Sequence, residues 1–211
     1  MQVLVLNSGS SSIKFQVFKM PAAEVIASGM VERIGLEDAK ISYNIGVTKF
    51  EEIKSIKDHK AGLTLIAEYL LDTDKGVIKK PEEIHIVGHR VVHGGSTFTR
   101  TVEITDEVKQ KIEKLSHLAP LHNPANLQGI IVSEQIFTNA KQVAVFDTAF
   151  HQTIPVVAHK YAIPNTFYEE EGIRLYGFHG TSHKYVSEKA MGYLDKPDAK
   201  IITIHLGNGC S

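Results

Sequence analysis

The sequence predicts an α/β protein, on the strength of two observations. After an opening meander, short apolar segments typical of strands alternate with longer segments whose apolar residues have helical spacing. An apolar strand followed by a loop rich in Gly, Ser and Asn also occurs twice, at Val3–Ser12 and at Ile201–Ser211. This repeat suggests two related domains that face one cleft. Because a strand needs a partner, the second copy also suggests that the sequence is a fragment of a longer chain.

The elements of the opening meander follow from hydrophobic periodicity. Val3–Leu6 is uninterrupted and apolar, which predicts a strand buried on both faces. Ile13–Phe18 alternates apolar and polar residues, so we expect a half-buried strand. Two further strands are expected around Glu24–Arg33 and Ala39–Ile45.

Each later element has apolar residues at the spacing of its type, with Thr105 or Asp106 near one helix N-cap and Pro124 in the first turn of another. In chain order they are a helix over Lys60–Leu71, a strand over Ile84–Gly88, helices over Thr105–Leu115 and Asn123–Phe137, a strand over Gln142–Phe146, a helix in the later part of His179–Leu194 and a strand over Ile201–His205.

Composition excludes several classes of protein. The 211 residues carry 23 Lys and Arg against 24 Asp and Glu, which excludes a nucleic-acid binder that relies on bulk positive charge. The single cysteine, Cys210, excludes an intramolecular disulfide and a four-cysteine zinc site. No apolar run approaches the roughly 20 residues that span a bilayer, and the start lacks the pattern of a secretory signal. We therefore predict a cytoplasmic protein without a membrane partner.

The first loop has the composition of a phosphate cradle. Asn7–Ser12 offers backbone amides, four hydroxyls and one side-chain amide, and Lys14 follows on the next strand. Gly9 permits close approach of a ligand. The pattern is not a Walker A loop, because GxxxxGK[ST] is absent and a strand follows. A Ser-rich hairpin turn without function remains the alternative.

The segment GHRVVHGG places an arginine at the end of a predicted strand. In an extended chain Arg90 and Val92 share one face, and His89, Val91 and His93 share the other. A guanidinium beside an apolar side chain suits a small carboxylate. Two alternatives remain, namely that His89 and His93 bind a metal or that Arg90 is a surface residue before a Gly-Gly turn.

Two further polar residues stand at element boundaries. His122 lies between two prolines, just before a predicted helix, where it could donate to a phosphoryl oxygen or merely cap that helix. Asp147 ends a predicted strand, a place where α/β enzymes often carry functional side chains. Its alternative role is to cap the following turn.

The segment HGTSH brings two histidines into i, i+4 spacing. His179 and His183 could share a metal, but no third acidic or cysteine ligand is near in sequence, so a phosphate-facing His179 flanked by Gly is favoured. His205–Gly209 is a second candidate phosphate cradle or a structural turn. Together these candidates indicate phosphoryl transfer, whereas the absence of G-x-S-x-G disfavours a serine hydrolase.

At this point the sequence resembles the N-terminal half of the acetate kinase family. The likeness rests on VLVLNSGSSSIKFQVF, GHRVVHGG, LAPLHNPANL, VAVFDTAFHQTIP, YGFHGTSHKYVS and IITIHLGNGCS, in the family's order. It implies ribonuclease-H-like domains of the actin-like ATPase type, with a mixed sheet flanked by helices. It also implies reversible phosphoryl transfer from ATP to acetate with Mg²⁺, and a homodimer.

The resemblance assigns expected roles to individual residues. Asn7 would lie near Mg²⁺, and Arg90 would bind both the carboxylate and the transferring phosphoryl group. His122 and His179 would contact the phosphoryl group, and Asp147 would be the acid/base. The expected methyl-pocket walls are Val92, Leu121 and Phe178, and the expected ATP contacts are Ser10, Ser12, Lys14, His205, Leu206, Gly207, Asn208 and Gly209.

The resemblance also implies a division of the chain and limits on its activity. We expect an acid-binding domain over residues 1–150 and the beginning of a nucleotide-binding domain over 151–211. A second arginine, a magnesium-binding glutamate and the adenine pocket would lie outside this sequence, so the chain alone is expected to be inactive. A propionate or butyrate kinase, a non-catalytic nucleotide-binding protein and a metallohydrolase built from the eleven histidines remain the alternatives.

Overall fold

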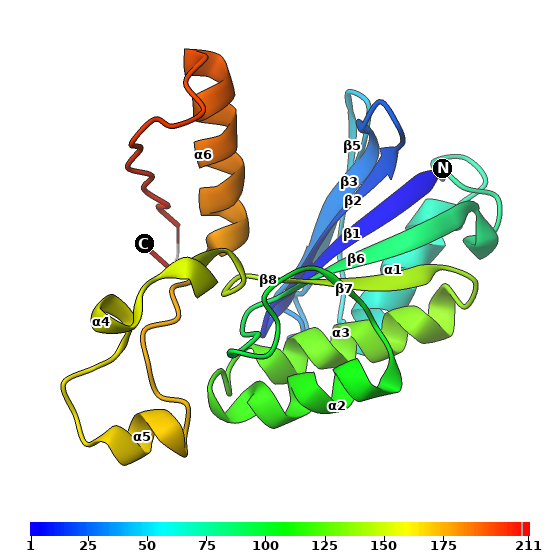
Figure 1. The fold of residues 1–211 in the computed structure, drawn as a ribbon. Coiled ribbons are helices and arrows are strands. Elements are labelled where there is room, and N and C mark those ends of the chain that lie inside the picture. Colours follow the sequence, from blue (N-terminus) through cyan, green and yellow to red (C-terminus); the bar gives the residue numbers. More distant parts are fainter. Residues whose placement is uncertain (208) are drawn as a thin grey trace. The chain divides into compact units, whose positions relative to one another are not determined.

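A computed structural model describes residues 1–207 and 209–211 (Figure 1). The chain forms two compact units. Unit 1 comprises Met1–Val91 and Val102–Ala144, and unit 2 comprises Val92–Thr101 and Val145–Ser211. No helix in the described part of the chain has the length and apolar character needed to cross a membrane.

The strands form one mixed sheet of eight, in the order β5-β4-β3-β2-β1-β6-β8-β7. Strand β1 pairs antiparallel with β2 and parallel with β6. The antiparallel meander β1–β5 therefore continues into the rest of the sheet through the parallel strand β6. The strand bounds are β1 Gln2–Ser8, β2 Ser12–Lys19, β3 Glu24–Glu32, β4 Lys40–Ile45, β5 Thr48–Ile53, β6 Ile84–Val91, β7 Val102–Glu103 and β8 Lys141–Phe146. The predicted α/β class with a mixed sheet is confirmed.

Helices α1 (His59–Leu71) and α3 (Asn123–Ile136) pack against the same face of the sheet, and α2 (Asp106–Lys114) packs on α3 (Figure 1). Asp58 caps α1 by accepting from the Ala61 N–H at 2.7 Å, and Thr105 caps α2 as predicted. The shared core contains, among others, Leu4, Leu6, Ile13, Phe15, Tyr43, Leu63, Ile66, Leu70, Val87 and Val132.

The prediction that the first strand is buried on both faces is wrong. Leu4 and Leu6 are buried, but Val5 is 38% exposed. Val5 lines a shallow hollow of about 480 Å³ with polar residues of neighbouring strands, including Lys14 and Gln16. An uninterrupted apolar run does not reveal which faces are covered, because coverage depends on helices that are distant in sequence.

Two strands were not predicted. β5 carries Lys49, Glu51 and Glu52, and these charged residues conceal its strand character. It is an edge strand, where charged side chains discourage pairing with other chains. β7 has only two residues, too few to show a periodicity.

Unit 2 has less regular structure. It contains the short helices η3 (Phe150–Thr153), α4 (Val156–His159) and α5 (Asn165–Glu169), and the longer α6 (Gly180–Leu194). Two single-turn helices of unit 1, η1 (Pro81–Glu83) and η2 (Leu115–His117), complete the set of helices in the described residues.

The predicted strand over Ile201–His205 is wrong. In the described residues this segment has no ladder, and Ile202 and Ile204 are 93% and 73% exposed. The chain instead turns back, so that His205 and Ser211 exchange two backbone hydrogen bonds. A strand requires a hydrogen-bonded neighbour, and the sheet formed by the described residues does not include this segment.

Candidate functional site

The first predicted cradle is the turn of the β1–β2 hairpin. We call Ser8–Ser12 the serine loop. The Gly9 N–H donates to the Ser12 carbonyl at 2.8 Å, which closes a tight turn around Ser10 and Ser11. Both of these residues are exposed, so a ligand can reach the tip of the turn.

Three polar side chains stand on adjacent strands beside this loop. Asn7 and Lys14 are direct cross-strand partners in the antiparallel register of β1 and β2. Arg90 extends from β6, and its Nη1 donates to Asn7 Oδ1 at 3.3 Å. The structure thus brings together one ammonium group, one guanidinium and one amide, which are separated by up to 83 positions in sequence. This set can bind an anion.

The predicted alternation along β6 is confirmed. His89 and Val91 are buried, whereas Arg90 is half-buried. The His89 Nε2–H donates to Gln142 Oε1 at 2.8 Å, and Ser133 Oγ donates to the same oxygen at 3.2 Å. Burial lowers the pKa of His89 to about 4, while the Gln142 contact opposes that shift. His89 Nε2 is therefore engaged by a side-chain amide inside the buried network, which disfavours the alternative that it binds a metal.

The loop before α3 presents two of the candidates. His122 is the N-cap residue of α3, but its side chain makes no capping hydrogen bond. Its imidazole is exposed, and the side chain of Leu121 is 76% exposed. The alternative that His122 serves as a side-chain cap is therefore not supported.

Asp147 follows β8 and is almost fully buried, at 1% exposure. Its carbonyl accepts from the Gly180 N–H at 2.9 Å, and its Oδ1 accepts from the Thr181 hydroxyl at 3.3 Å. A Cβ at position 180 would lie 2.1 Å from the Asp147 carbonyl oxygen. Glycine is required there because the start of α6 lies directly on the end of the strand.

His179 is held in an unusual conformation immediately before α6. It has a φ of 54° in the left-handed region, which is uncommon for any residue other than Gly. Its ring stacks on that of His205, with centroids 4.1 Å apart, and its Nδ1 lies 2.8 Å from Ser211 Oγ. Strained residues of this kind cluster at functional sites.

His183 belongs to the same cluster of rings. Its Nε2 lies 2.9 Å from Ser211 Oγ and its Nδ1 lies 2.6 Å from Thr203 Oγ1. Burial lowers the pKa of His183, and neighbouring His151 and His205 lower it further. Both ring nitrogens of His183 thus lie within hydrogen-bond distance of a hydroxyl oxygen. The described residues contain no group of three or more His, Cys, Asp or Glu side chains that could hold a metal.

The two candidates for an apolar pocket in unit 2 differ in exposure. Val92 is half-buried and Phe178 is 42% exposed. The Phe178 ring lies 5.7 Å from that of His93, and its carbonyl accepts from the His151 Nε2–H at 3.1 Å. Gly177 gives His151 room, because a Cβ there would lie 2.6 Å from the imidazole ring.

The second predicted cradle is a tight turn. The Gly207 N–H donates to the Gly209 carbonyl at 3.1 Å, inside the pair of hydrogen bonds that joins His205 to Ser211. The side chain of Leu206 is 79% exposed. Asn208, also predicted to contact ATP, lies outside the described residues.

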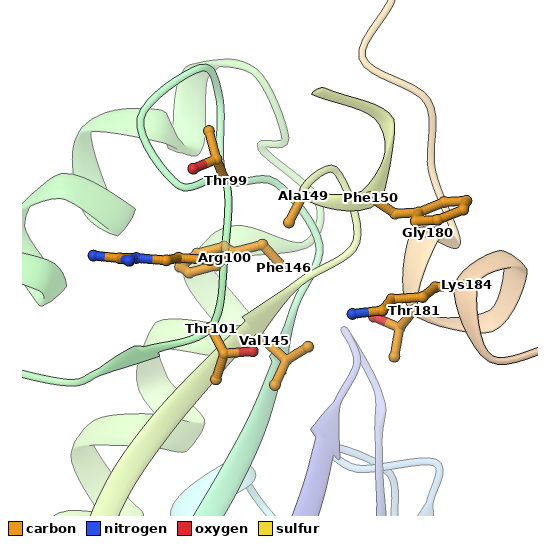
Figure 2. A pocket seen from close by; sticks show the side chains of 10 residues that line it. All are labelled: Thr99, Arg100, Thr101, Val145, Phe146, Ala149, Phe150, Gly180, Thr181 and Lys184. Atoms are coloured by element: carbon orange, nitrogen blue, oxygen red, sulfur yellow. The ribbon is translucent and has the colours of Figure 1, made fainter. Parts of the chain in front are cut away.

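Figure 2 shows a pocket of about 470 Å³ in unit 2 that contains none of the predicted site residues. Its walls come from residues 99–101, the end of β8, the start of η3 and the first two turns of α6. Thr181 and Lys184 point into it from α6, whereas the Arg100 guanidinium points away from them. Thr181 lines this pocket and also donates its hydroxyl hydrogen to Asp147, one of the predicted site residues.

Three residues that contact the predicted site were missed. Thr181 lies inside the HGTSH segment, between the two histidines, so this motif already points to the region that contacts Asp147. Asn126 and His59 contact the serine loop from two helices, with Asn126 Nδ2 donating to the Ser8 carbonyl and His59 Nε2 donating to the Gly9 carbonyl, both at 2.6 Å. No sequence pattern relates His59 to a loop 50 residues earlier.

The donor set of the site can be tested against Mg²⁺. Asn7 Oδ1 is an oxygen ligand of the type that Mg²⁺ prefers, but the Arg90 guanidinium donates to it. One amide oxygen beside a cation fits a Mg²⁺ that arrives with a nucleotide and keeps its phosphate and water ligands. It does not fit a metal held by protein side chains alone.

Comparison with known proteins identifies the family of this chain. The sequence profile described as "Acetokinase family" matches residues 2–211. The chain belongs to the acetokinase family. An acetokinase relative, the acetate kinase of Flavobacterium johnsoniae, is 65% identical over 211 residues, which are 100% of this chain and 53% of that protein. The chain thus spans about half the length of this relative and corresponds to its N-terminal half.

Solved acetokinase structures support the fold. The crystal structure of Porphyromonas gingivalis acetate kinase superposes with a TM-score of 0.91 at 45% identity, covering 99% of this chain and 53% of that one. A propionate kinase from Francisella tularensis superposes equally well, with a TM-score of 0.91 at 41% identity and the same coverage. Overall similarity therefore does not distinguish between two carboxylate substrates.

Proposed function

We propose that the natural-length protein transfers the γ-phosphoryl group of ATP to acetate, reversibly, to give acetyl phosphate and ADP. The observation that carries this proposal is the contact of Arg90 with Asn7 beside Lys14, next to the exposed tip of the serine loop. A guanidinium can bind a carboxylate and a phosphoryl oxygen together, while the loop and the ammonium group bind the nucleotide. The family membership supports the same reaction.

The reaction is a direct in-line displacement. A carboxylate oxygen of acetate attacks the γ-phosphorus, the bond to the β,γ-bridging oxygen breaks, and ADP leaves with that electron pair. Carboxylic acids of this kind have a pKa near 4, so the nucleophile is already ionised at pH 7 and needs no base. Positioning and neutralisation of charge therefore supply most of the rate enhancement.

We assign the residues as follows. Arg90 holds the carboxylate against the γ-phosphoryl group, and His122 and His179 donate hydrogen bonds to phosphoryl oxygens. Bound with ATP, Mg²⁺ would neutralise phosphate charge, and the Asn7 amide oxygen is the protein group that would help to hold it. Asp147 acts as an acceptor that organises the site. Val92, Leu121 and Phe178 enclose the methyl group, and the ATP contacts are Ser10, Ser12, Lys14, His205, Leu206, Gly207 and Gly209, with Asn208 as a sequence-based addition.

Hydroxylamine trapping of acyl phosphate tests this function. The natural-length protein is incubated with ATP and Mg²⁺ and, in parallel, with acetate, propionate and butyrate. We expect the most hydroxamate from acetate. A preference for a longer acid would keep the mechanism and change the substrate, the alternative that the propionate kinase neighbour favours. No hydroxamate with any acid, from folded protein, would favour a nucleotide-binding protein without kinase activity.

Four further proposals go beyond the reaction itself. Residues 1–211 alone should have little or no turnover, because they span only about half of the relative from Flavobacterium johnsoniae. We also propose an acid-binding domain over residues 1–150, with a nucleotide-binding domain beginning at 151. The homodimer and the cytoplasmic location stay predictions from the family resemblance.

A further inference from the structure

We propose that His59 and Asn126 are positioning residues that orient the serine loop toward the phosphates of ATP, an inference that rests on the proposed function. Neither residue belongs to the site assigned above. Both act on backbone carbonyls of the loop, and they reach it from two different helices.

The contacts account for four carbonyl groups of the loop. The Ser8 carbonyl accepts from Asn126 Nδ2 and the Gly9 carbonyl accepts from His59 Nε2, both at 2.6 Å. The Ser11 carbonyl accepts from the Ile34 N–H at 3.0 Å, and the Ser12 carbonyl accepts from the Gly9 N–H at 2.8 Å. Two of these four bonds are made by side chains, and these two can be changed by mutation.

A phosphate cradle built from backbone works only if its N–H groups, and not its C=O groups, are directed at the anion. A carbonyl oxygen that faced the phosphate would repel it. Hydrogen bonds that hold the carbonyls on the protein side therefore favour the anion-binding orientation before the nucleotide arrives. Preorganisation of this kind raises affinity because the loop does not have to be ordered on binding.

The surrounding packing agrees with a built support. His59 is the first residue of α1, directly after the Asp58 N-cap, so its backbone is fixed by the helix start. Asn126 is only 3% exposed, in the second turn of α3. One turn further on, Gly129 allows α3 to approach the loop, because a Cβ there would lie 2.4 Å from Ser8 Oγ.

The test compares His59→Ala, His59→Gln and Asn126→Asp in the natural-length protein. The glutamine amide can still donate to the Gly9 carbonyl. The aspartate keeps the shape of Asn126 but cannot donate, so two oxygens would face each other. His117→Ala is the matched control, because His117 Nδ1 also donates to a backbone carbonyl, that of Lys114 at 2.7 Å, outside the loop.

We expect His59→Ala and Asn126→Asp to raise the KM for ATP about tenfold or more, the size of one hydrogen bond, with the KM for acetate within twofold of the parent. His59→Gln should restore the KM for ATP to within about threefold, and His117→Ala should leave it unchanged. A merely structural role would lower the thermal midpoint without separating the two KM values. Should Asn126→Asp not fold, the two His59 variants decide the matter.

The inference is overturned if the parent is active and both disruptive variants keep the parental KM for ATP. Failure of the proposed function gives a different result, namely no acyl phosphate from the parent with any acid. In that case calorimetric titration of the same variants with Mg·ATP decides the inference from the binding constants. A parent that does not bind Mg·ATP would overturn both.

Discussion

His89 shows how a buried side chain beside the site makes stability depend on pH. It lies next to Arg90 in sequence, on the opposite face of β6, and its bond to Gln142 joins strands β6 and β8. A neutral imidazole satisfies this geometry, whereas a charged one would be desolvated beside an uncharged amide. The residue thus stabilises the strand that carries Arg90 only while it is unprotonated.

We predict a loss of stability as pH falls from about 6.5 to 4. The pKa of His89 is about 4 in the folded chain and near 6.5 when unfolded, so the unfolded chain binds more protons in this window. The contribution that is lost is up to about 3 kcal/mol. Urea unfolding of the parent and of His89→Leu at pH 7 and pH 4.5 measures it.

His89→Leu should be less stable at pH 7 but should lose less stability on acidification. His85→Leu is the control, because it removes an exposed histidine from the same strand and should keep the parental loss. An equal loss in His89→Leu and the parent would mean that another group causes the acid sensitivity.

Asp147 illustrates how the observed contacts limit a predicted role. Its carboxylate accepts from Thr181, and the proposed nucleophile is already ionised at pH 7. We predict that Asp147→Asn lowers kcat about a hundredfold or more, the effect of removing one preorganised electrostatic group, without abolishing a limb of the pH–rate profile. The test is to measure kcat of the natural-length parent and of Asp147→Asn between pH 5.5 and 9. If one limb of the pH–rate profile disappears in Asp147→Asn, the acid/base role is restored.

At the scale of elements, the start of α6 determines where two predicted site residues stand. Gly180 donates to the Asp147 carbonyl and directly follows the strained His179. The helix therefore fixes a histidine and an aspartate that are 32 positions apart in sequence. This arrangement requires glycine at position 180, because the Asp147 carbonyl oxygen occupies the space that a Cβ would need.

Gly180→Ala and Gly192→Ala form a matched pair on this helix. A Cβ at position 180 would lie 2.1 Å from the Asp147 oxygen, so we predict a destabilisation of about 1–3 kcal/mol and a large loss of kcat. At position 192 nothing lies within 4 Å, so the alanine should stabilise the helix by about 0.5–1 kcal/mol with unchanged kcat. Thermal unfolding and initial rates of the natural-length protein measure the stability and the kcat of each variant. A Gly180→Ala variant that is as stable and as active as the parent would contradict the proposed packing.

At the scale of the whole molecule, the ordered sheet contrasts with the segment after α6. Strands β1 and β2 have partners on both sides and carry core residues. Ile201–His205 has no ladder and exposes its apolar side chains. Hydrogen bonding and burial are the properties that protect backbone amides from exchange.

We therefore predict that amides of β1 and β2 exchange slowest in the 211-residue chain and that those of residues 201–204 exchange within seconds. Hydrogen exchange measured by mass spectrometry on peptides from both regions provides the comparison. Slow exchange at residues 201–204 would show that this segment pairs with a strand after all.

Local sequence predicted most of the regular elements. The helices α1, α2, α3 and α6 and six of the eight strands were expected near their observed positions, because periodicity and helix caps act over a few residues. The errors concern Val5 and Ile201–His205, where the answer depends on a distant partner. Burial of a strand face requires a helix to cover it, and a strand requires another strand beside it.

Within the candidate site, local motifs are enough to identify the chemical groups: a serine loop, Lys14, Arg90, Asp147 and the HGTSH histidines. Which of these groups come into contact depends on how the chain packs. The parallel pairing of β6 with β1 brings Arg90 to Asn7, and the close approach of α1 and α3 allows His59 and Asn126 to hold the serine loop. Such contacts join residues that are 50 to 118 positions apart, and a local pattern does not encode them because chain packing creates them.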